Sequence, residues 1–128
     1  MILSDNEFII MNLLWKEDRP LSRAEILKGT PRRNWNPASV HLILNSMLSK
    51  GVLKITDETQ RYGRTYEACI TKAEYIVGVI EGTFAGISKG EIIKDLIAAY
   101  RKELGEDEIA ELVEILQTPV SKRGRKKK

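Results

Sequence analysis

Residues 34–56, NWNPASVHLILNSMLSKGVLKIT, contain a helix start, a helix stop and a change in hydrophobic period. Asn36 followed by Pro37 is typical of a helix N-terminus, because proline at the first helical position loses no hydrogen bond. Apolar residues then recur at helical spacing as far as Gly51, which is expected to end the helix. The β-branched run 52–56 indicates a strand. The stretch therefore predicts a helix that leads directly into a strand.

Two further helices are predicted ahead of this stretch. Ser4 with Glu7 and Ser22 with Glu25 each form a capping box, in which the hydroxyl and the carboxylate satisfy backbone amides of the first turn. After the stretch, a polar connection containing Gly63 leads to a second short alternating segment, which predicts a β-hairpin. The predicted helices cover about 5–16, 23–28 and 37–50, and the predicted strands cover 52–56 and 65–70.

Three helices followed by a hairpin are the elements of a winged helix-turn-helix domain, whose third helix can enter a DNA major groove. Capping boxes at Thr71 with Glu74 and Ser88 with Glu91 predict that the chain is helical again after the hairpin. The predicted fold class is mostly α with a small β-hairpin. The expected parts are a winged-helix domain over 1–70, a helical dimerisation region over 71–118, with helices at 72–87, 89–104 and 107–117, and a basic tail over 119–128.

The charge is distributed unevenly along the chain, although the net charge is only +3. Residues 1–70 hold ten basic and eight acidic residues, whereas residues 71–120 hold five basic and ten acidic ones. The last eight residues hold six basic residues and no acidic one. An acidic second half would repel a polyanion. A nucleic acid is therefore expected to bind the first 70 residues, and the tail is expected to be either a phosphate-attracting arm or a solubilising end.

The chain has one cysteine, Cys69, and one histidine, His41. This composition argues against an internal disulfide framework, a cysteine-based zinc cluster and Ser-His-Asp chemistry within one chain. We therefore expect no enzymatic activity, metal or cofactor, and we expect Cys69 to be a small buried residue. The longest stretch without charge, residues 34–49, is too short to span a membrane, and the N-terminus has no basic signal region. The expected location is the cytoplasm.

The polar side of the predicted third helix is the candidate DNA-reading surface. Serine and asparagine side chains can hydrogen-bond base edges, and small apolar groups can contact a thymine methyl group. The alternative interpretation is that these residues form only the solvated face of an amphipathic helix. The candidate base contacts are Ala38, Ser39, His41, Leu42, Asn45 and Ser46. The candidate phosphate contacts, which would set affinity without reading sequence, are Arg23, Lys28, Arg32, Arg33, Lys50, Lys54, Arg61 and Arg64.

The apolar residues predict which helix faces pack. On the first and third helices the predicted inner residues are Phe8, Met11, Leu14, Trp15, Val40, Ile43, Leu44, Met47 and Leu48, with Trp35 as a loop anchor. The C-terminal helices have more apolar surface than loosely attached helices could hide, so it is expected either to pack on the first domain or, as we favour, to pair with a second copy. The candidate interface is Ile76, Val79, Ile80, Phe84, Ile92, Ile93, Leu96, Ile97, Leu112, Val113 and Leu116.

A combination of short motifs over residues 3–70 resembles the penicillinase-repressor family of bacterial transcriptional regulators (the BlaI/MecI/CopY group). The motifs are Leu3-Ser4-Asp5 with Glu7, Met11 and Trp15-Lys16; Trp35-Asn36-Pro37; Ser39-Val40, Leu44 and Lys50-Gly51; and Gly63-Arg64 with Tyr66. The resemblance implies a homodimer, joined through the C-terminal helices, that occupies an operator dyad and blocks transcription until a signal releases it.

Three features depart from the pattern of that family. Ser46 stands where relatives often have a basic residue, so the outer face of the third helix has no formal charge before Lys50. The Cys-x-Cys type of cluster of copper-responsive members is missing. Residues 93–96, Ile-Lys-Asp-Leu, lack the Asn-Phe bond at which antibiotic-responsive members are cleaved. The inducing signal, which could be an inducer molecule or a protease, is therefore not identified.

The leading functional hypothesis is a dimeric, sequence-specific DNA-binding repressor. The alternative is a winged-helix module that binds protein instead of DNA, and the uncharged third helix favours it. An enzyme is the least supported class, because no nucleophile–base pair, phosphate-binding loop or metal cluster can be assembled from these residues.

Overall fold

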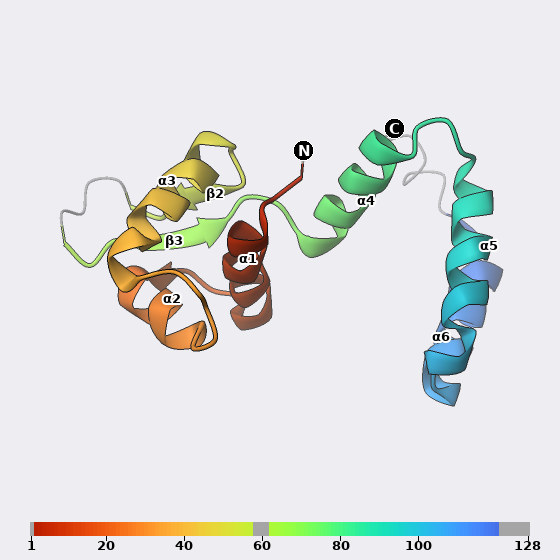
Figure 1. Ribbon diagram of the computed structural model, residues 1–128. Coiled ribbons are helices and arrows are strands. Elements are labelled where there is room, and N and C mark those ends of the chain that lie inside the picture. Colours follow the sequence, from red (N-terminus) through yellow and green to blue (C-terminus); the bar gives the residue numbers. More distant parts are fainter. Residues whose placement is uncertain (1, 58–61, 121–128) are drawn as a thin grey trace. The chain divides into compact units, whose positions relative to one another are not determined.

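The computed structural model describes residues 2–57 and 62–120. In this part of the chain the elements follow the predicted order, with three helices, a hairpin and three more helices (Figure 1). The first helices are α1 (Asp5–Glu17), α2 (Arg23–Gly29) and α3 (Val40–Ser49), and one 3-10 turn, η1 (Pro37–Ser39), precedes α3. The predicted helix over 37–50 is therefore tighter in its first turn. The fold class, a winged helix-turn-helix domain followed by helices, is confirmed.

Local sequence explains the boundaries of these helices. The capping boxes of Ser4 with Glu7 and Ser22 with Glu25 are both formed. Asn36, in contrast, makes no side-chain cap, and its carbonyl instead accepts the Ser39 amide at 2.9 Å. After α3, Gly51 has a φ of 78°, a left-handed conformation that is costly for residues with a Cβ atom. The chain can therefore turn sharply from α3 into the hairpin.

The hairpin is part of a three-stranded antiparallel sheet, where a two-stranded hairpin was predicted. Strands β2 (Leu53–Ile55) and β3 (Thr65–Ala68) pair as expected, and β1 (Leu21–Ser22) lies on the other side of β3. Tyr66 is opposite Ile55 on one strand and opposite Leu21 on the other. The sheet thereby ties the start of α2 to the hairpin.

The core lies between the sheet and the first three helices, and all of its buried apolar residues fall between positions 3 and 66. The predicted inner residues of α3 are buried or half-buried. On α1 the prediction was wrong for Phe8, which is 41% exposed, whereas Ile10 is fully buried. Cys69 is also exposed and not buried as expected. Among the described residues, the fully buried core side chains are Ile10, Met11, Leu21, Ile26, Leu44, Met47, Val40 and Val52.

Helix α4 (Lys72–Thr83) begins at the capping box of Thr71 with Glu74 and is attached to α1 by its first turn. The Tyr75 ring packs near Phe8 and Trp15, with centroids 6.2 and 5.9 Å away, and its hydroxyl accepts the Leu3 amide at 2.9 Å. The first compact unit consequently continues to Ala85, beyond the predicted domain end at residue 70. The helix ends at Thr83, although residues 72–87 were predicted.

The second compact unit begins at Gly86. It contains α5 (Lys89–Tyr100), a 3-10 turn η2 (Arg101–Glu103) and α6 (Glu106–Gln117). Within the part of the chain that the structure describes, none of the residues of α4, α5 and α6 is buried. These helices therefore expose much of their apolar surface.

Candidate nucleic-acid interface

The outward surface of α3 is formed by four exposed residues, His41, Leu42, Asn45 and Ser49. His41 and Asn45 are four residues apart, so their side chains lie on one face of the helix, one turn from each other. Leu42 is 62% exposed although it is a large apolar residue. This surface combines an imidazole, an amide and an aliphatic side chain, which are the groups that read donors, acceptors and methyl groups on DNA bases.

The hydrogen bonding of His41 fixes the role of one ring nitrogen. Its Nδ1 lies 2.8 Å from the carbonyl oxygen of Ala38. Because a carbonyl can only accept, Nδ1 carries the hydrogen. The ring therefore offers Nε2 for a further hydrogen bond with a ligand. Ala38 itself is exposed in η1.

Two of the predicted base contacts are less exposed than expected. Ser39 is half-buried in η1. Ser46 is half-buried as well, and its hydroxyl donates to Glu7 Oε2 of α1 at 2.7 Å. The prediction that Ser46 lies on the outer surface of α3 is wrong, because this residue is on the flank that packs against α1.

The predicted phosphate contacts fall into two groups. Arg23, Lys28, Arg32, Lys54 and Arg64 have exposed side chains, and Lys54 Nζ lies 3.8 Å from Glu67 Oε2 across the hairpin. In a second group, the cation is held by the protein. The guanidinium of half-buried Arg33 donates to the carbonyl oxygens of Leu27 and Thr30 at 2.9 and 3.0 Å and so caps the end of α2. Lys50 Nζ is 2.6 Å from Glu7 Oε1. Arg33 and Lys50 thus have partners within the protein, whereas their contact with phosphate stays a prediction, and Arg61 lies outside the described residues.

A shallow hollow of about 410 Å³ lies where the hairpin meets the start of α2. Arg23 and Arg64 both line it, so the fold brings together two cations that are far apart in sequence. Gly63 has a φ of 65°, which places a tight turn between Tyr62 and Arg64. Tyr62 is 84% exposed and was not among the predicted site residues. Its place in a polar connection next to glycine was the signal that could have identified it.

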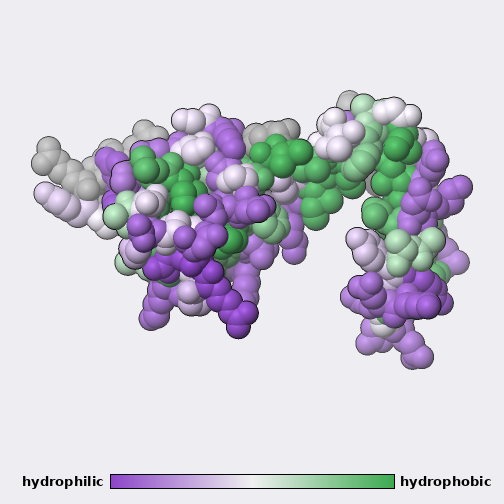
Figure 2. Space-filling model, viewed as in Figure 1, coloured by the Kyte–Doolittle hydropathy of each residue, from purple (hydrophilic) through white to green (hydrophobic). Residues whose placement is uncertain are grey.

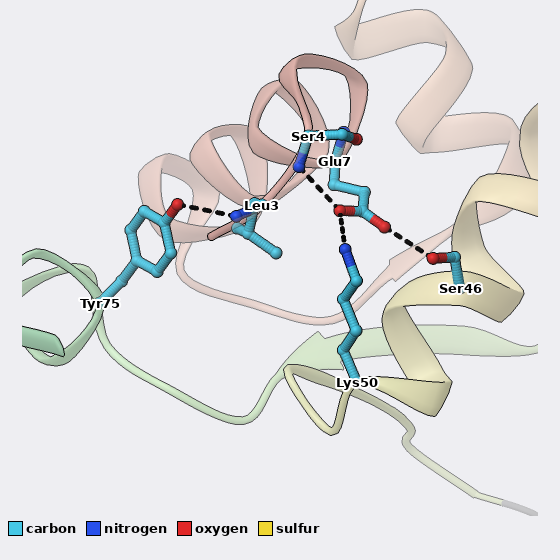
Figure 3. Close-up of polar contacts among 6 residues, drawn as sticks. All are labelled: Leu3, Ser4, Glu7, Ser46, Lys50 and Tyr75. Carbon is cyan, nitrogen blue, oxygen red and sulfur yellow. Dashed lines mark hydrogen bonds and ion pairs between the residues drawn. The ribbon is translucent and has the colours of Figure 1, made fainter. Parts of the chain in front are cut away.

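Glu7 is the one buried acidic residue within the described ranges, with 4% of its surface exposed (Figure 3). It accepts hydrogen bonds from the Ser4 amide at 2.9 Å, the Ser46 hydroxyl and the Lys50 ammonium. Burial raises the pKa of this carboxyl, but the hydrogen bonds from Lys50, the Ser4 backbone and Ser46, with the positive charge of Lys50, lower it to about 2. Glu7 is therefore ionised at neutral pH and ties α1 to α3.

The helices α4 to α6 carry exposed apolar residues that resemble an uncovered interface. Figure 2 shows hydrophobic surface over α4 and along α5. Six of the eleven predicted interface residues are more than 40% exposed, and five exposed large apolar residues between 71 and 120 were not predicted. The predicted ones with large exposure are Ile76, Phe84, Ile93, Leu96, Val113 and Leu116, whereas Val79, Ile80, Ile92, Ile97 and Leu112 are half-buried. The additional ones are Val77, Tyr100 and Ile115 on the helices, Ile87 between α4 and α5, and Val120 after α6.

Two other kinds of site are absent from the described residues. No group of three or more histidine, cysteine, aspartate or glutamate residues is placed to hold a metal ion. No helix in this part of the chain has the length and apolar character needed to cross a membrane.

A polar outward helix, a hairpin beside it that carries the exposed Arg64, and a three-stranded sheet define a winged-helix DNA-binding protein. The sequence model of the penicillinase repressor family matches residues 3–118. The chain belongs to the penicillinase repressor family, as the short motifs predicted. It is therefore a DNA-binding transcriptional regulator, and membership of a regulator family agrees with the expectation that it is not an enzyme.

Individual relatives are distant. The chain is 24% identical over 117 residues to an uncharacterised 16.5 kDa protein of Latilactobacillus sakei encoded in the ptsI 3′ region, a match that covers 89% of this chain and 77% of that protein. Among solved structures, it is similar to BpsR of Bordetella bronchiseptica, whose DNA binding is regulated by 6-hydroxynicotinic acid (16% identity, 90% of this chain and 77% of that chain, TM-score 0.48). It is also similar to a PadR family transcription regulator of Clostridium difficile (19% identity, 73% of this chain and 95% of that chain, TM-score 0.41).

Proposed function

We propose that this protein is a dimeric repressor that occupies an operator dyad through α3 and is released from it by a signal not yet identified. The observation that carries the proposal is the outward surface of α3, on which His41, Leu42 and Asn45 are exposed beside the hairpin. On a helix laid in a major groove, these residues would face the base edges. Asn45 would bind adenine through two hydrogen bonds, and Leu42 would contact a thymine methyl group.

Phosphate contacts supply the positioning in this proposal. Arg23 and Arg64 would hold one backbone at the hollow between α2 and the hairpin, and Lys28 and Arg32 would add charge after α2. Arg61 and the basic tail remain candidates on sequence grounds. Because α3 is uncharged over its outward surface, affinity would come mainly from these flanking cations and specificity from α3.

The dimer is supported by the surface of α4, α5 and α6. Monomeric soluble proteins rarely expose large contiguous apolar patches, and these helices have exposed residues such as Ile93 and Leu116 and no buried ones within the described residues. Pairing two copies would cover this surface and present two reading helices to two half-sites. The interface proposed from the sequence is retained.

The release signal would differ from two that act on members of the family, namely metal binding to a Cys-x-Cys type of cluster and cleavage at an Asn-Phe bond. Cys69 is the only cysteine in the 128 residues, and residues 93–96 contain no Asn-Phe bond. A protease acting elsewhere or a small-molecule inducer would be compatible with the fold.

A second candidate function is protein binding by the same surface. The exposed Leu42 and the absence of formal charge on the outward residues of α3 favour it. A protein partner would not produce the salt dependence that phosphate contacts require, so one experiment distinguishes the two functions.

That experiment measures the affinity of the purified protein for duplex DNA between about 50 and about 200 mM salt. With four phosphate-contacting cations in each of two protomers, affinity should fall roughly a thousandfold or more over this range. The variant Arg23→Gln should lower the slope of log affinity against log salt, and Lys94→Gln, which removes a charge from α5, should not. Binding that is insensitive to salt, or no binding to DNA, would refute the proposed function.

A further inference from the structure

The contacts of Glu7 join the start of α1 to one flank of α3 (Figure 3). Oε2 accepts the Ser46 hydroxyl at 2.7 Å, and Oε1 accepts the Lys50 ammonium at 2.6 Å. Ser46 and Lys50 are one helical turn apart, so a single carboxylate holds two successive turns of α3. The same carboxylate also accepts the Ser4 amide at 2.9 Å, which fixes its own position at the N-terminus of α1.

The position of these contacts on α3 relates them to the proposed reading surface. A helix advances by about 100° per residue, which places Ser46 and Lys50 beside the outward surface and not opposite to it. The opposite side of α3 is fixed by the core residues Val40, Leu44 and Met47. The hydrogen bonds to Glu7 add directional contacts on the flank of α3, and together with the core packing they resist a rotation of the helix about its axis.

The Glu7–Lys50 ion pair is only partly buried, because 5% of the Glu7 side chain but 35% of the Lys50 side chain is exposed. Removing the carboxylate from water nevertheless costs several kcal/mol. Glu7 has 4% of its surface exposed and so bears this cost. The three hydrogen bonds that Glu7 accepts offset this cost, and because hydrogen bonds are directional they also orient α3 relative to α1.

We propose that Glu7 is a positioning residue for DNA reading, which acts through Ser46 and Lys50 to hold α3 in one orientation and keeps Lys50 from contacting phosphate. The inference rests on the proposed function, because it assigns Glu7 a role in how α3 meets DNA. The hydrogen bond to Glu7 also gives a role to Ser46, which stands at a position where relatives often have a basic residue. Ser46 has an internal partner and needs none on the DNA.

The test compares variants of the full chain on two duplexes, one selected by the wild-type protein from a random pool and one with the same bases scrambled. Each binding curve is measured over a series of salt concentrations, and unfolding is measured in parallel. The matched control is Glu74→Gln, because Glu74 belongs to the same type of capping box at α4 and bonds only the backbone of its own box.

We expect Glu7→Gln to lower the ratio of selected to scrambled binding about tenfold, as for one lost base contact. The released Lys50 should also raise the salt slope by about 1 for each protomer. Lys50→Gln should leave the salt slope unchanged, because this lysine is already paired within the protein. A role in stability alone would lower the unfolding temperature and would move neither the ratio nor the slope of the folded protein.

Two results would overturn the inference. One is a Glu7→Gln protein with the same ratio of selected to scrambled binding and the same salt slope as Glu74→Gln. The other is a Lys50→Gln protein whose salt slope falls by about 1, because this lysine would then contact phosphate in the wild-type protein. If Glu7→Gln does not fold, Ser46→Ala and Lys50→Gln remove the same contacts from the side of α3. An unchanged ratio of selected to scrambled binding in both variants would refute the inference. A wild-type protein without salt-dependent DNA binding would instead refute the proposed function itself.

Discussion

Burial raises the pKa of the Glu7 carboxyl, whereas its hydrogen bonds and the charge of Lys50 lower it. The net shift makes the free energy of unfolding depend on pH. The pKa of Glu7 falls from 4.5 to about 2 in the folded protein, although burial alone would raise it. A carboxyl whose pKa is lower in the folded protein stabilises the fold at pH values above its pKa in the unfolded chain. This contribution disappears as the pH falls through its pKa in the folded protein. The shift corresponds to about 3 kcal/mol. The stabilisation should therefore be complete above about pH 5 and decline between about pH 4.5 and pH 2.

Denaturant unfolding of the wild-type protein and Glu7→Gln across this pH range measures the contribution. The difference between their free energies of unfolding should be largest near neutral pH and should shrink toward zero as the pH approaches about 2. A difference that stayed constant over the whole range would mean that Glu7 is not held as a carboxylate by Lys50 and Ser46.

At the scale of single residues, the sequence predicted local bonds better than long-range ones. The capping box correctly paired Ser4 with Glu7, since both partners lie in one helical turn. The other two partners of the Glu7 carboxylate, Ser46 and Lys50, are 39 and 43 positions away in the sequence. No local pattern shows that Ser46 faces α1, because a serine at the border of an amphipathic helix fits either side. The exposure of His41 and Asn45, in contrast, followed from the helical period alone.

At the scale of elements, the Tyr75 hydroxyl adds a hydrogen bond to the aromatic packing that attaches α4 to α1. Tyr75→Phe keeps the ring beside Phe8 and Trp15 but leaves the Leu3 amide, in a partly buried place, without its acceptor. An unsatisfied buried donor costs about 1–3 kcal/mol. Denaturant unfolding should show a loss of this size for Tyr75→Phe and no measurable loss for Tyr100→Phe, which removes a hydroxyl from an exposed residue of α5. Equal stability of the two variants would exclude this role for the hydroxyl.

The elements that the sequence predicted are those with strong local signals. Four of the helices begin at the predicted hydroxyl caps, because a capping box is contained in four residues. Strand β1 was missed, since two residues are too short for a periodic pattern and their partner, β3, is distant in sequence. Helix α4 was predicted four residues too long, and glycines at 82 and 86 are the local signal of its earlier end.

At the scale of the whole molecule, the exposed apolar residues of α5 and α6 lead to a prediction about assembly. A charge placed at the centre of an apolar interface is strongly unfavourable, because it would be buried without a partner. Leu116→Glu should therefore halve the mass in solution, measured by sedimentation equilibrium, and weaken operator binding. Gln117→Glu introduces the same group at the neighbouring exposed residue, which is outside the proposed interface, and should leave the mass unchanged. A Leu116→Glu protein with the mass of the wild type would show that this residue is not in a dimer interface.

The central claim is that two copies of the protein read DNA through the outward surface of α3. Selection of bound duplexes from a random pool, performed with the wild-type protein and with Asn45→Ala, tests it most directly. The wild-type protein should recover an inverted repeat whose half-sites are centred about 10 base pairs, or a multiple of this, apart. Asn45→Ala should lose the preference at one position of each half-site, where the wild-type protein selects adenine. Recovery of the same motif by both proteins, or of no inverted repeat by the wild type, would contradict the account.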